Sequence, residues 1–182
     1  MIDLVDCVNK TASLHQRLLL VLQSGTVKRF HTTPTLHENI LAQHQWGVAI
    51  LAYTLAHDKP SVNLLMSALT HDLAEKVYGD IPAPAKRALG LRETINDLEA
   101  SFIRDKAGFF PLTAEELNIV KLADNLDGML YCIHERILGN RWADTVYERF
   151  RGYVHTEQTL NEWQFLVVRE VELLWEEAKY GR

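Results

Sequence analysis

Two histidines and two aspartates occupy positions from which they could bind one metal ion: His44, the adjacent pair His71 and Asp72, and Asp124. Imidazole nitrogens and carboxylate oxygens form a mixed ligand set that suits a divalent transition metal. Such a set leaves coordination positions for water or a phosphate oxygen, as hydrolytic metal catalysis requires. Taken alone, each residue is more often an ordinary hydrogen-bonded or solvated side chain. Together they predict metal-assisted hydrolysis.

The setting of these residues favours the metal interpretation. The apolar run LLMSAL ends one residue before Thr70-His71, at residue 69, and WGVAIL begins two residues after His44. Polar groups placed in buried stripes are costly unless they are bound to partners. Adjacent residues on a helix point about 100° apart, so His71 and Asp72 would have to approach one ion from both sides of a groove between helices.

Two further carboxylates are candidates for proton transfer. On a continuous helix, Glu75 would lie one turn beyond His71 on the same face, where it could act as a general base. The alternative is a solvent-facing carboxylate paired with Lys76 or a more distant cation. Asp80 follows Gly79 in a stiff, proline-rich turn. Such turns often present functional groups, although aspartate is also an ordinary turn residue.

Cations and aromatic side chains near these positions suggest an anionic, base-containing substrate. Arg29, Lys86 and Lys121 are candidates for binding phosphate, the arginine through fork-shaped contacts and the lysines as point charges. Phe30 and Trp46 could stack on a base, although isolated aromatic residues more often serve packing.

The overall composition fits one globular domain spanning residues 1–182. The chain is 47% hydrophobic, and its net charge of −5 argues against binding along a nucleic acid. Its two cysteines form no CxxC pair, so we expect a reducing, cytoplasmic compartment. We find no signal peptide, and no apolar run is long enough to span a membrane.

Helical periodicity dominates the sequence and predicts an all-α fold. We expect a helix at 11–23 ended by Gly25, one at about 40–57 capped by Asn39, and one at about 62–77 capped by Ser61. Pro82 and Pro84 should keep the next stretch from being regular helix. Further helices are expected at 91–107, from the capping box at Thr113 to about 138, and at roughly 141–151 and 157–179.

The same residues resemble a known family. His44, His71-Asp72 and Asp124 match the H…HD…D signature of the HD superfamily of metal phosphohydrolases. The stretch HDLAEKVYGDIPAPAK resembles the second motif of the small 5′-deoxynucleotidases and their relatives. VKLAD resembles the last motif, and VKRFHTTP resembles the substrate segment before the first histidine. The similarity runs from about residue 25 to about residue 135.

The resemblance implies a compact helical HD-type fold and one metal ion, Zn²⁺, Co²⁺ or Mn²⁺, bound by the four His/Asp residues. It implies that Glu75 and Asp80 are the catalytic carboxylates and that Arg29, Lys86 and Lys121 contact phosphate or sugar. It also implies a homo-oligomer, because relatives assemble as dimers or larger rings. Three positions depart from the pattern and bear on base selectivity: Phe30, often Trp in relatives; Gln45, often Ser; and Thr32, often a bulkier apolar residue.

Two branches of the family are similar to this chain. The RFHTTP segment and Trp46 favour the phage dATP triphosphohydrolase branch, which releases triphosphate and a deoxynucleoside, with a second ion such as Mg²⁺ on the triphosphate. The alternative is a 5′-deoxynucleotidase acting on deoxynucleoside monophosphates. A third hypothesis, of another class, is a non-catalytic nucleotide-binding module. We expect a purine deoxynucleotide, dATP first, with Phe30 stacking on the base and Thr32 and Pro84 near its edge.

Overall fold

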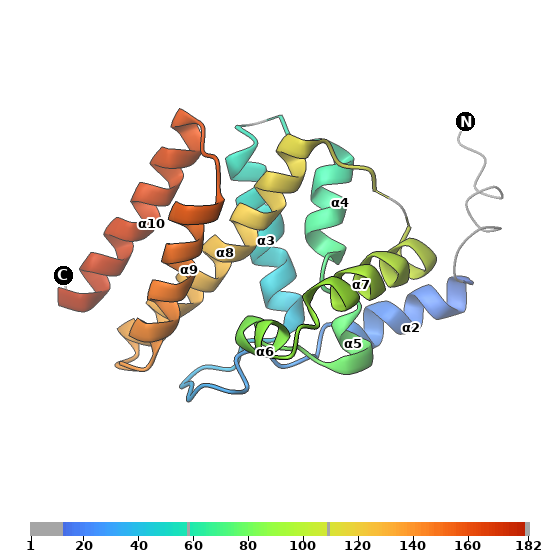
Figure 1. The fold of residues 1–182 in the computed structure, drawn as a ribbon, viewed down its shortest axis with the longest axis horizontal. Helices are drawn as coiled ribbons and strands as arrows, with labels where there is room; N and C mark the ends of the chain where they lie inside the picture. The colour runs from blue at the N-terminus through green and yellow to red at the C-terminus, as the bar shows by residue number, and fades with distance from the viewer. Residues whose placement is uncertain (1–12, 58, 109, 181–182) are drawn as a thin grey trace.

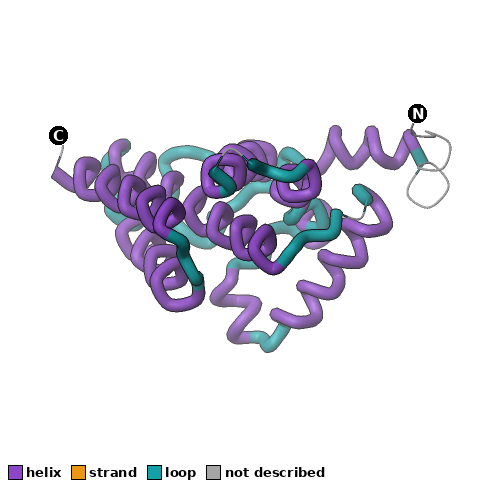
Figure 2. The backbone as a smooth tube through the Cα atoms, turned by 90° about the horizontal axis from the view of Figure 1, so that it is seen from above, coloured by secondary structure: helices purple, strands orange, loops and turns teal. Residues whose placement is uncertain are grey.

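The computed structural model describes residues 13–57, 59–108 and 110–180, and all regular secondary structure in these ranges is helical (Figures 1 and 2). The prediction of an all-α fold is confirmed. Cys7 and the expected first residues of the helix at 11–23 lie outside the described residues. The helices are α2 (Leu14–Ser24), α3 (Leu41–Leu55), α4 (Val62–Thr70), α5 (Glu75–Tyr78), α6 (Ala83–Ala88), α7 (Arg92–Lys106), α8 (Ala114–Ile137), α9 (Ala143–Glu157) and α10 (Glu162–Tyr180).

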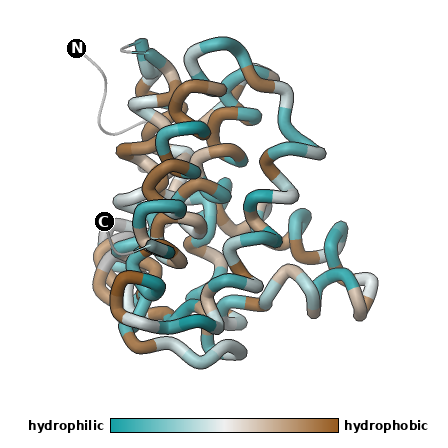
Figure 3. Tube along the Cα trace, turned by 90° about the vertical axis from the view of Figure 1, so that its left-hand side faces the viewer, coloured by the Kyte–Doolittle hydropathy of each residue, from teal (hydrophilic) through white to brown (hydrophobic). Residues whose placement is uncertain are grey.

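Helix α8 is the centre of the packing. It contacts α3, α4, α9 and α10, and it passes between the α9–α10 pair and the α3–α4 pair (Figure 1). Its side chains Leu122, Leu126 and Met129 are fully buried. Burying an aliphatic side chain of this size contributes about 1.5–3 kcal/mol, so α8 anchors the elements that surround it. Hydrophobic and hydrophilic residues alternate along the helices, as one-sided burial requires (Figure 3).

Several predicted helix ends agree with the structure. The Thr113 hydroxyl accepts from the Glu116 amide, and the Glu116 side chain accepts from the Thr113 amide, which completes the expected capping box. The Ser61 hydroxyl accepts from the Leu64 amide at 3.0 Å. Gly139, with φ +97°, follows the end of α8 in a conformation that favours glycine.

The continuous helix predicted at 62–77 is wrong. Helix α4 ends at Thr70, residues 71–74 form turns, and α5 begins only at Glu75. The amides of Leu73 and Glu75 bond three residues back, to Thr70 and Asp72, which tightens the chain beyond α-helical geometry. Glu75 therefore does not lie one turn beyond His71 on a continuous helix.

Two smaller expectations also fail. Asn39 does not cap α3: the cap residue is Ile40, whose aliphatic side chain cannot accept a hydrogen bond. The Asn39 backbone carbonyl pairs with the Arg29 amide at 2.9 Å. Pro82 and Pro84 do not prevent regular helix. Pro82 is the cap of α6, and Pro84 lies in its first turn, where a missing amide hydrogen costs no helical bond.

Residues 29–39 form a closed loop between α2 and α3. Its ends meet in an antiparallel bridge between Lys28 and Ile40, and the Leu41 amide donates to the Val27 carbonyl at 2.9 Å. Within the described ranges, no helix is long and apolar enough to cross a membrane.

Candidate metal centre and active site

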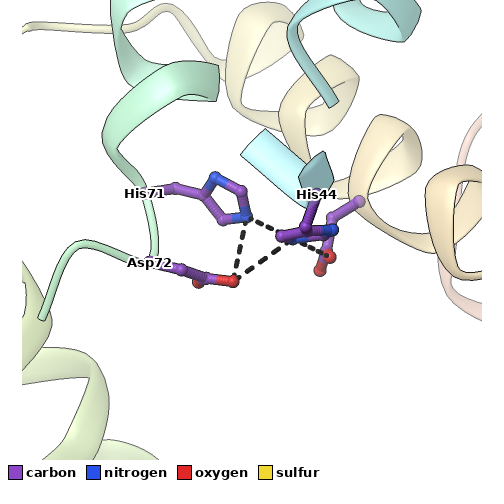
Figure 4. Close-up of side chains that lie close together, drawn as sticks. His44, His71 and Asp72 are labelled. Carbon is purple, nitrogen blue, oxygen red and sulfur yellow. Dashed lines mark hydrogen bonds and ion pairs between the residues drawn. The ribbon is translucent and has the colours of Figure 1, made fainter. Parts of the chain in front are cut away.

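The four predicted ligands come together from three separate stretches of chain. His44 lies in α3, His71 and Asp72 lie where α4 ends, and Asp124 lies in α8. One ligand atom from each residue lies within 4.8 Å of the other three, so the group could hold a metal ion. Nε2 of His44 lies 3.2 Å from Nε2 of His71 and 3.3 Å from both Oδ2 of Asp72 and Oδ1 of Asp124 (Figure 4).

His71 and Asp72 converge on one point although they are adjacent in the sequence. They lie where α4 passes into turns with bonds three residues back, so neighbouring side chains stay roughly 120° apart and approach that point from different directions. Nε2 of His71 and Oδ2 of Asp72 lie 3.3 Å apart and face His44 together (Figure 4). The sequence pattern identified the residues, but only the structure shows that they reach one point.

The hydrogen bonds of the two imidazoles orient both Nε2 atoms for binding a cation. Nδ1 of His71 lies 2.9 Å from the Ala68 carbonyl oxygen, which can only accept, so Nδ1 carries the proton. Nδ1 of His44 lies 2.7 Å from Oδ2 of Asp127, which fixes the same tautomer when that carboxylate is ionised. Each neutral ring then presents a bare Nε2 lone pair toward the cluster, which is the donor arrangement that a metal ion requires.

Asp127 was not singled out from the sequence. It lies one turn beyond Asp124 on α8, and its carboxylate approaches α3 where Gly47 has no side chain. A Cβ built on Gly47 would lie 2.0 Å from Oδ1 of Asp127. An acidic residue three positions after a candidate ligand, and a glycine three positions after His44, were the available signals.

The cluster favours positive charge. Burial and Arg29 lower the pKa of His44, but hydrogen bonds to Asp124, Asp127 and Asp72 outweigh them and raise it well above its ordinary value. Burial raises the pKa of Asp72, but His71, His44 and Arg29 hold it well below its usual range. A bound cation would supply the charge that these carboxylates favour.

The two candidate catalytic carboxylates differ in their surroundings. Glu75 is 3% exposed, and burial together with the negative charge of Asp72 raises its pKa to about 8. Its Oε2 is buried without a hydrogen-bond partner, while Oε1 lies 3.8 Å from Nη1 of Arg29. Asp80 follows Gly79, and its Oδ2 lies 3.9 Å from Nδ1 of His31.

Arg29 lies inside the cluster rather than at its rim. Its guanidinium contacts Oδ2 of Asp72 at 2.7 Å and lies 3.9 Å from Oδ1 of Asp124, with only 12% of the side chain exposed. Next to it, Phe30 has φ +55°, a conformation that aromatic residues rarely adopt. The Phe30 ring stacks on Tyr131 at 4.4 Å and meets Phe150 edge-on at 6.2 Å. Neither of these two aromatic partners was predicted.

The other predicted substrate contacts are more scattered. Nζ of Lys86 pairs with Glu99 at 3.1 Å, whereas the side chain of Lys121 is exposed. Thr32 and Pro84 are exposed as well, in the closed loop and in α6. Trp46 is 67% exposed. Two residues along a helix turn the side chain by about 200°, so Trp46 lies on the side of α3 away from His44.

A helical fold that gathers H…HD…D residues from three segments defines an HD-type, metal-dependent phosphohydrolase. Residues 18–169 match the family described as 5′-deoxynucleotidase YfbR-like, and the chain belongs to this family. It is also similar to a dATP triphosphohydrolase of Salmonella phage PMBT28, with 27% identity over 175 residues that cover 86% of this chain and 84% of the relative.

Solved structures share the fold. The PH0347 protein of Pyrococcus horikoshii OT3 is similar with a TM-score of 0.72 and 23% identity, over 88% of this chain and 99% of that one. An HD-domain phosphohydrolase of Listeria innocua has a TM-score of 0.68 and 20% identity, over 93% and 99%. The HD phosphohydrolase DatZ of cyanophage S-2L, solved with dA and one catalytic Zn²⁺ ion, has a TM-score of 0.57 and 18% identity, over 95% and 99%.

Proposed function

We propose that this chain hydrolyses a purine deoxynucleoside triphosphate, dATP first, to the deoxynucleoside and triphosphate. The observation that carries the proposal is the His/Asp cluster with Arg29 and Phe30 beside it, in a chain similar over most of its length to a dATP triphosphohydrolase. A structural neighbour bound to dA and Zn²⁺ supports the same class of substrate.

In this proposal, His44, His71, Asp72 and Asp124 hold one divalent ion, Zn²⁺, Co²⁺ or Mn²⁺. An ion bound by such a set lowers the pKa of a coordinated water towards about 7 and polarises a phosphoryl oxygen. The donor set fits, because two Nε2 lone pairs and two carboxylates face one another. The site offers no sulfur, which is consistent with all three metals.

Glu75 handles the proton in this proposal. A general base works best when its pKa lies near the operating pH, and burial beside Asp72 raises the pKa of Glu75 to about 8 in the metal-free protein. Its unpartnered Oε2 is free to accept a hydrogen bond from a water or a substrate group. Asp80 is the second candidate carboxylate, and its Oδ2 lies 3.9 Å from Nδ1 of His31 in the closed loop.

Positive charge on the substrate side comes first from Arg29, which offsets charge on the phosphate oxygens. Lys86 can contribute if it exchanges Glu99 for phosphate, and Lys121 can contribute from the exposed side of α8. A triphosphate carries more charge than a monophosphate, so a second ion such as Mg²⁺ is part of the triphosphate proposal.

The second candidate is a 5′-deoxynucleotidase that removes phosphate from deoxynucleoside monophosphates. The family description favours it. A non-catalytic nucleotide-binding module is a third hypothesis, but it would have no need for four convergent ligands and a buried glutamate.

Three further predictions stay proposals: one domain across residues 1–182, a homo-oligomer and a cytoplasmic location. Light scattering of the purified protein tests the oligomer.

A nucleotide panel tests the function. Mono-, di- and triphosphates of each deoxynucleoside are incubated with the protein and added Zn²⁺, Co²⁺, Mn²⁺ or Mg²⁺, and the phosphorus product is identified. Intact triphosphate from dATP is the expected result. Inorganic phosphate from dAMP, with dATP untouched, would transfer the function to the monophosphatase. Binding without any hydrolysis under all four metals would favour the non-catalytic module.

A further inference from the structure

The closed loop at residues 29–39 carries Arg29 and Phe30 but depends on distant side chains for its shape. Its ends are fixed by the bridge between Lys28 and Ile40. Between those ends, the amides of Leu36 and His37 point away from the loop and bond to a side chain of α8. Whatever holds these amides therefore also determines where the loop presents its functional residues.

That side chain is Glu135, a carboxylate that is 1% exposed. Its Oε2 accepts from the Leu36 amide at 2.7 Å, and its Oε1 accepts from the His37 amide at 2.6 Å. Nδ2 of Asn140 donates to Oε2 of Glu135 at 2.6 Å and to the Pro34 carbonyl at 2.8 Å. The Tyr131 hydroxyl donates to the His37 carbonyl. Two α8 side chains, together with Asn140, thus bind the loop at Pro34, Leu36 and His37.

Glu135 is held as an anion by the loop itself. Burial raises the pKa of Glu135, but hydrogen bonds from Asn140 and the amides of Leu36 and His37 outweigh burial and lower it. Within the described part of the chain, no lysine or arginine forms an ion pair with Glu135. A buried carboxylate satisfied by loop amides binds that loop more strongly than a neutral acceptor would.

The hold on the loop bears directly on Phe30. A bulky residue at φ +55° is strained, so the surrounding structure must maintain that conformation. Tyr131 stacks on the Phe30 ring and also bonds the loop at His37. Asp124, Asp127, Tyr131 and Glu135 follow one another at spacings of three and four residues, so one face of α8 faces both the metal cluster and the loop.

We propose that Glu135 is a positioning residue for the substrate base: it acts through the closed loop to hold Phe30 in place, and it has no part in metal binding. The assignment of Phe30 to the base rests on the proposed function. The hold of Glu135 on the loop rests only on the contacts above, so the two parts can fail separately.

Glu135→Gln tests the hold on the loop. The amide keeps the size of the carboxylate but replaces one accepting oxygen with a donor, which leaves one loop amide facing another donor. Amide hydrogen exchange in residues 31–39 should become about 10-fold faster or more, with metal content unchanged. Glu115→Gln, an exposed carboxylate at the start of α8, is the matched control and should leave exchange unchanged. Unchanged loop exchange in Glu135→Gln would overturn the proposal.

A double-mutant cycle tests the route through Phe30. Glu135→Gln should raise the KM for the hydrolysed nucleotide about 10-fold and change kcat less than about 3-fold, and it should add little to KM in a Phe30→Ala background. A merely structural role would lower Tm and raise KM equally in both backgrounds, which would overturn the proposal. If the unaltered protein hydrolyses no nucleotide, the proposed function fails. The hydrogen-exchange measurement still tests whether Glu135 holds the loop.

If Glu135→Gln does not fold, Asn140→Ser provides a milder test. The shorter side chain removes the bridge from Glu135 to the Pro34 carbonyl but leaves the carboxylate and both loop amides in place. Loop exchange and KM should each rise by a few-fold over the unaltered protein. Exchange and KM both equal to those of the unaltered protein would overturn the proposal.

Discussion

The metal-ligand cluster and four of the predicted substrate contacts are built in opposite ways. In the cluster, His44 is 1% exposed, and each imidazole has a hydrogen-bond partner on its Nδ1. On the substrate side, Thr32, Pro84 and Lys121 are exposed, and Trp46 lies on the far side of its helix. One region is held by its own hydrogen bonds and ion pairs. The other consists of exposed side chains on separate elements, of which only Thr32 lies in the loop held from α8.

This difference indicates which residues should govern the reaction and which should govern substrate selectivity. A buried polar residue must be satisfied, so its partners constrain its position and protonation state. An exposed residue has no such constraint, and its role emerges only when a substrate is bound. Substitutions in the cluster should therefore remove the metal or the reaction, whereas substitutions on the substrate side should change affinity and base preference.

The largest effect is expected from His71→Ala/Asp72→Ala. Both side chains face the same point as His44, so their removal takes away half of the ligand set. Metal content should fall from about one ion per chain to none. Turnover should fall by roughly 10³-fold or more, the scale of losing an essential group. His15→Ala/Asp97→Ala, at exposed positions, is the matched control. Full metal content in the double variant would show that the cluster is not the metal site.

The next effect is expected from Glu75→Gln. Glutamine keeps the size and reach of the side chain but cannot act as a base, so turnover should fall by about 10²-fold while the metal stays bound. Glu93→Gln, in the exposed first turn of α7, is the control. Turnover equal to that of the unaltered protein would move proton transfer to Asp80 or to the metal-bound water alone.

The same substitution should change the stability of the metal-free protein with pH. The pKa of Glu75 is about 8 when folded and about 4.5 when unfolded, so the folded state keeps a proton that the unfolded chain loses. Stability therefore falls as pH rises from about 4.5 through 8, and Glu75→Gln removes this loss. In chelator-treated samples, the variant should gain up to about 5 kcal/mol in unfolding free energy over the unaltered protein at pH 9 and little at pH 5. If the difference in unfolding free energy between the two proteins is the same at pH 5 and pH 9, the raised pKa of Glu75 is contradicted.

A smaller effect is expected from Gly47→Ala. The new methyl group would displace the Asp127 carboxylate from His44, so metal affinity should fall by about 10–100-fold, the usual effect of losing such a partner. Gly152→Ala, a helical glycine of α9 with open space around it, is the control. It should stabilise the protein by about 1 kcal/mol through helix propensity and leave metal binding unchanged. Equal metal affinity in both variants would show that Asp127 can move without consequence.

The sequence predicted the parts of the molecule where local chemistry decides the outcome. The capping box at Thr113 and the cap at Ser61 are local, and both were predicted correctly. The apolar runs beside His44 and the His71-Asp72 pair favoured these residues as ligands, and the match to the H…HD…D signature supported all four. The break after Thr70 was not predicted, because the residues around it continue a helical pattern without glycine or proline.

Residues that act through tertiary contacts could not be predicted from their neighbours. Asp127 matters because α3 passes close to it at Gly47. Glu135 matters because a loop nearly a hundred residues earlier folds back onto α8. Phe150, in the last third of the chain, reaches Phe30 only because α9 packs against α8 at Gly128. Nothing in the periodicity of any one helix indicates these approaches.

The smallest effect is expected at the edge of the base. Stacking on an aromatic ring contributes about 1–3 kcal/mol and tolerates any base, so Phe30→Ala should weaken binding of dATP and dGTP alike, by about 10-fold. One face of Phe30 is covered by Tyr131, which leaves the base the opposite face.

Thr32 lies two residues after Phe30 in the exposed part of the loop, where a larger side chain can meet the edge of a base without disturbing the cluster. Thr32→Ile should therefore change the ratio of kcat/KM for dATP and dGTP by a few-fold, with Thr94→Ile on exposed α7 as control. Equal changes for both nucleotides would assign discrimination to another residue, and hydrolysis of dCTP or dTTP as fast as dATP would contradict the purine preference itself.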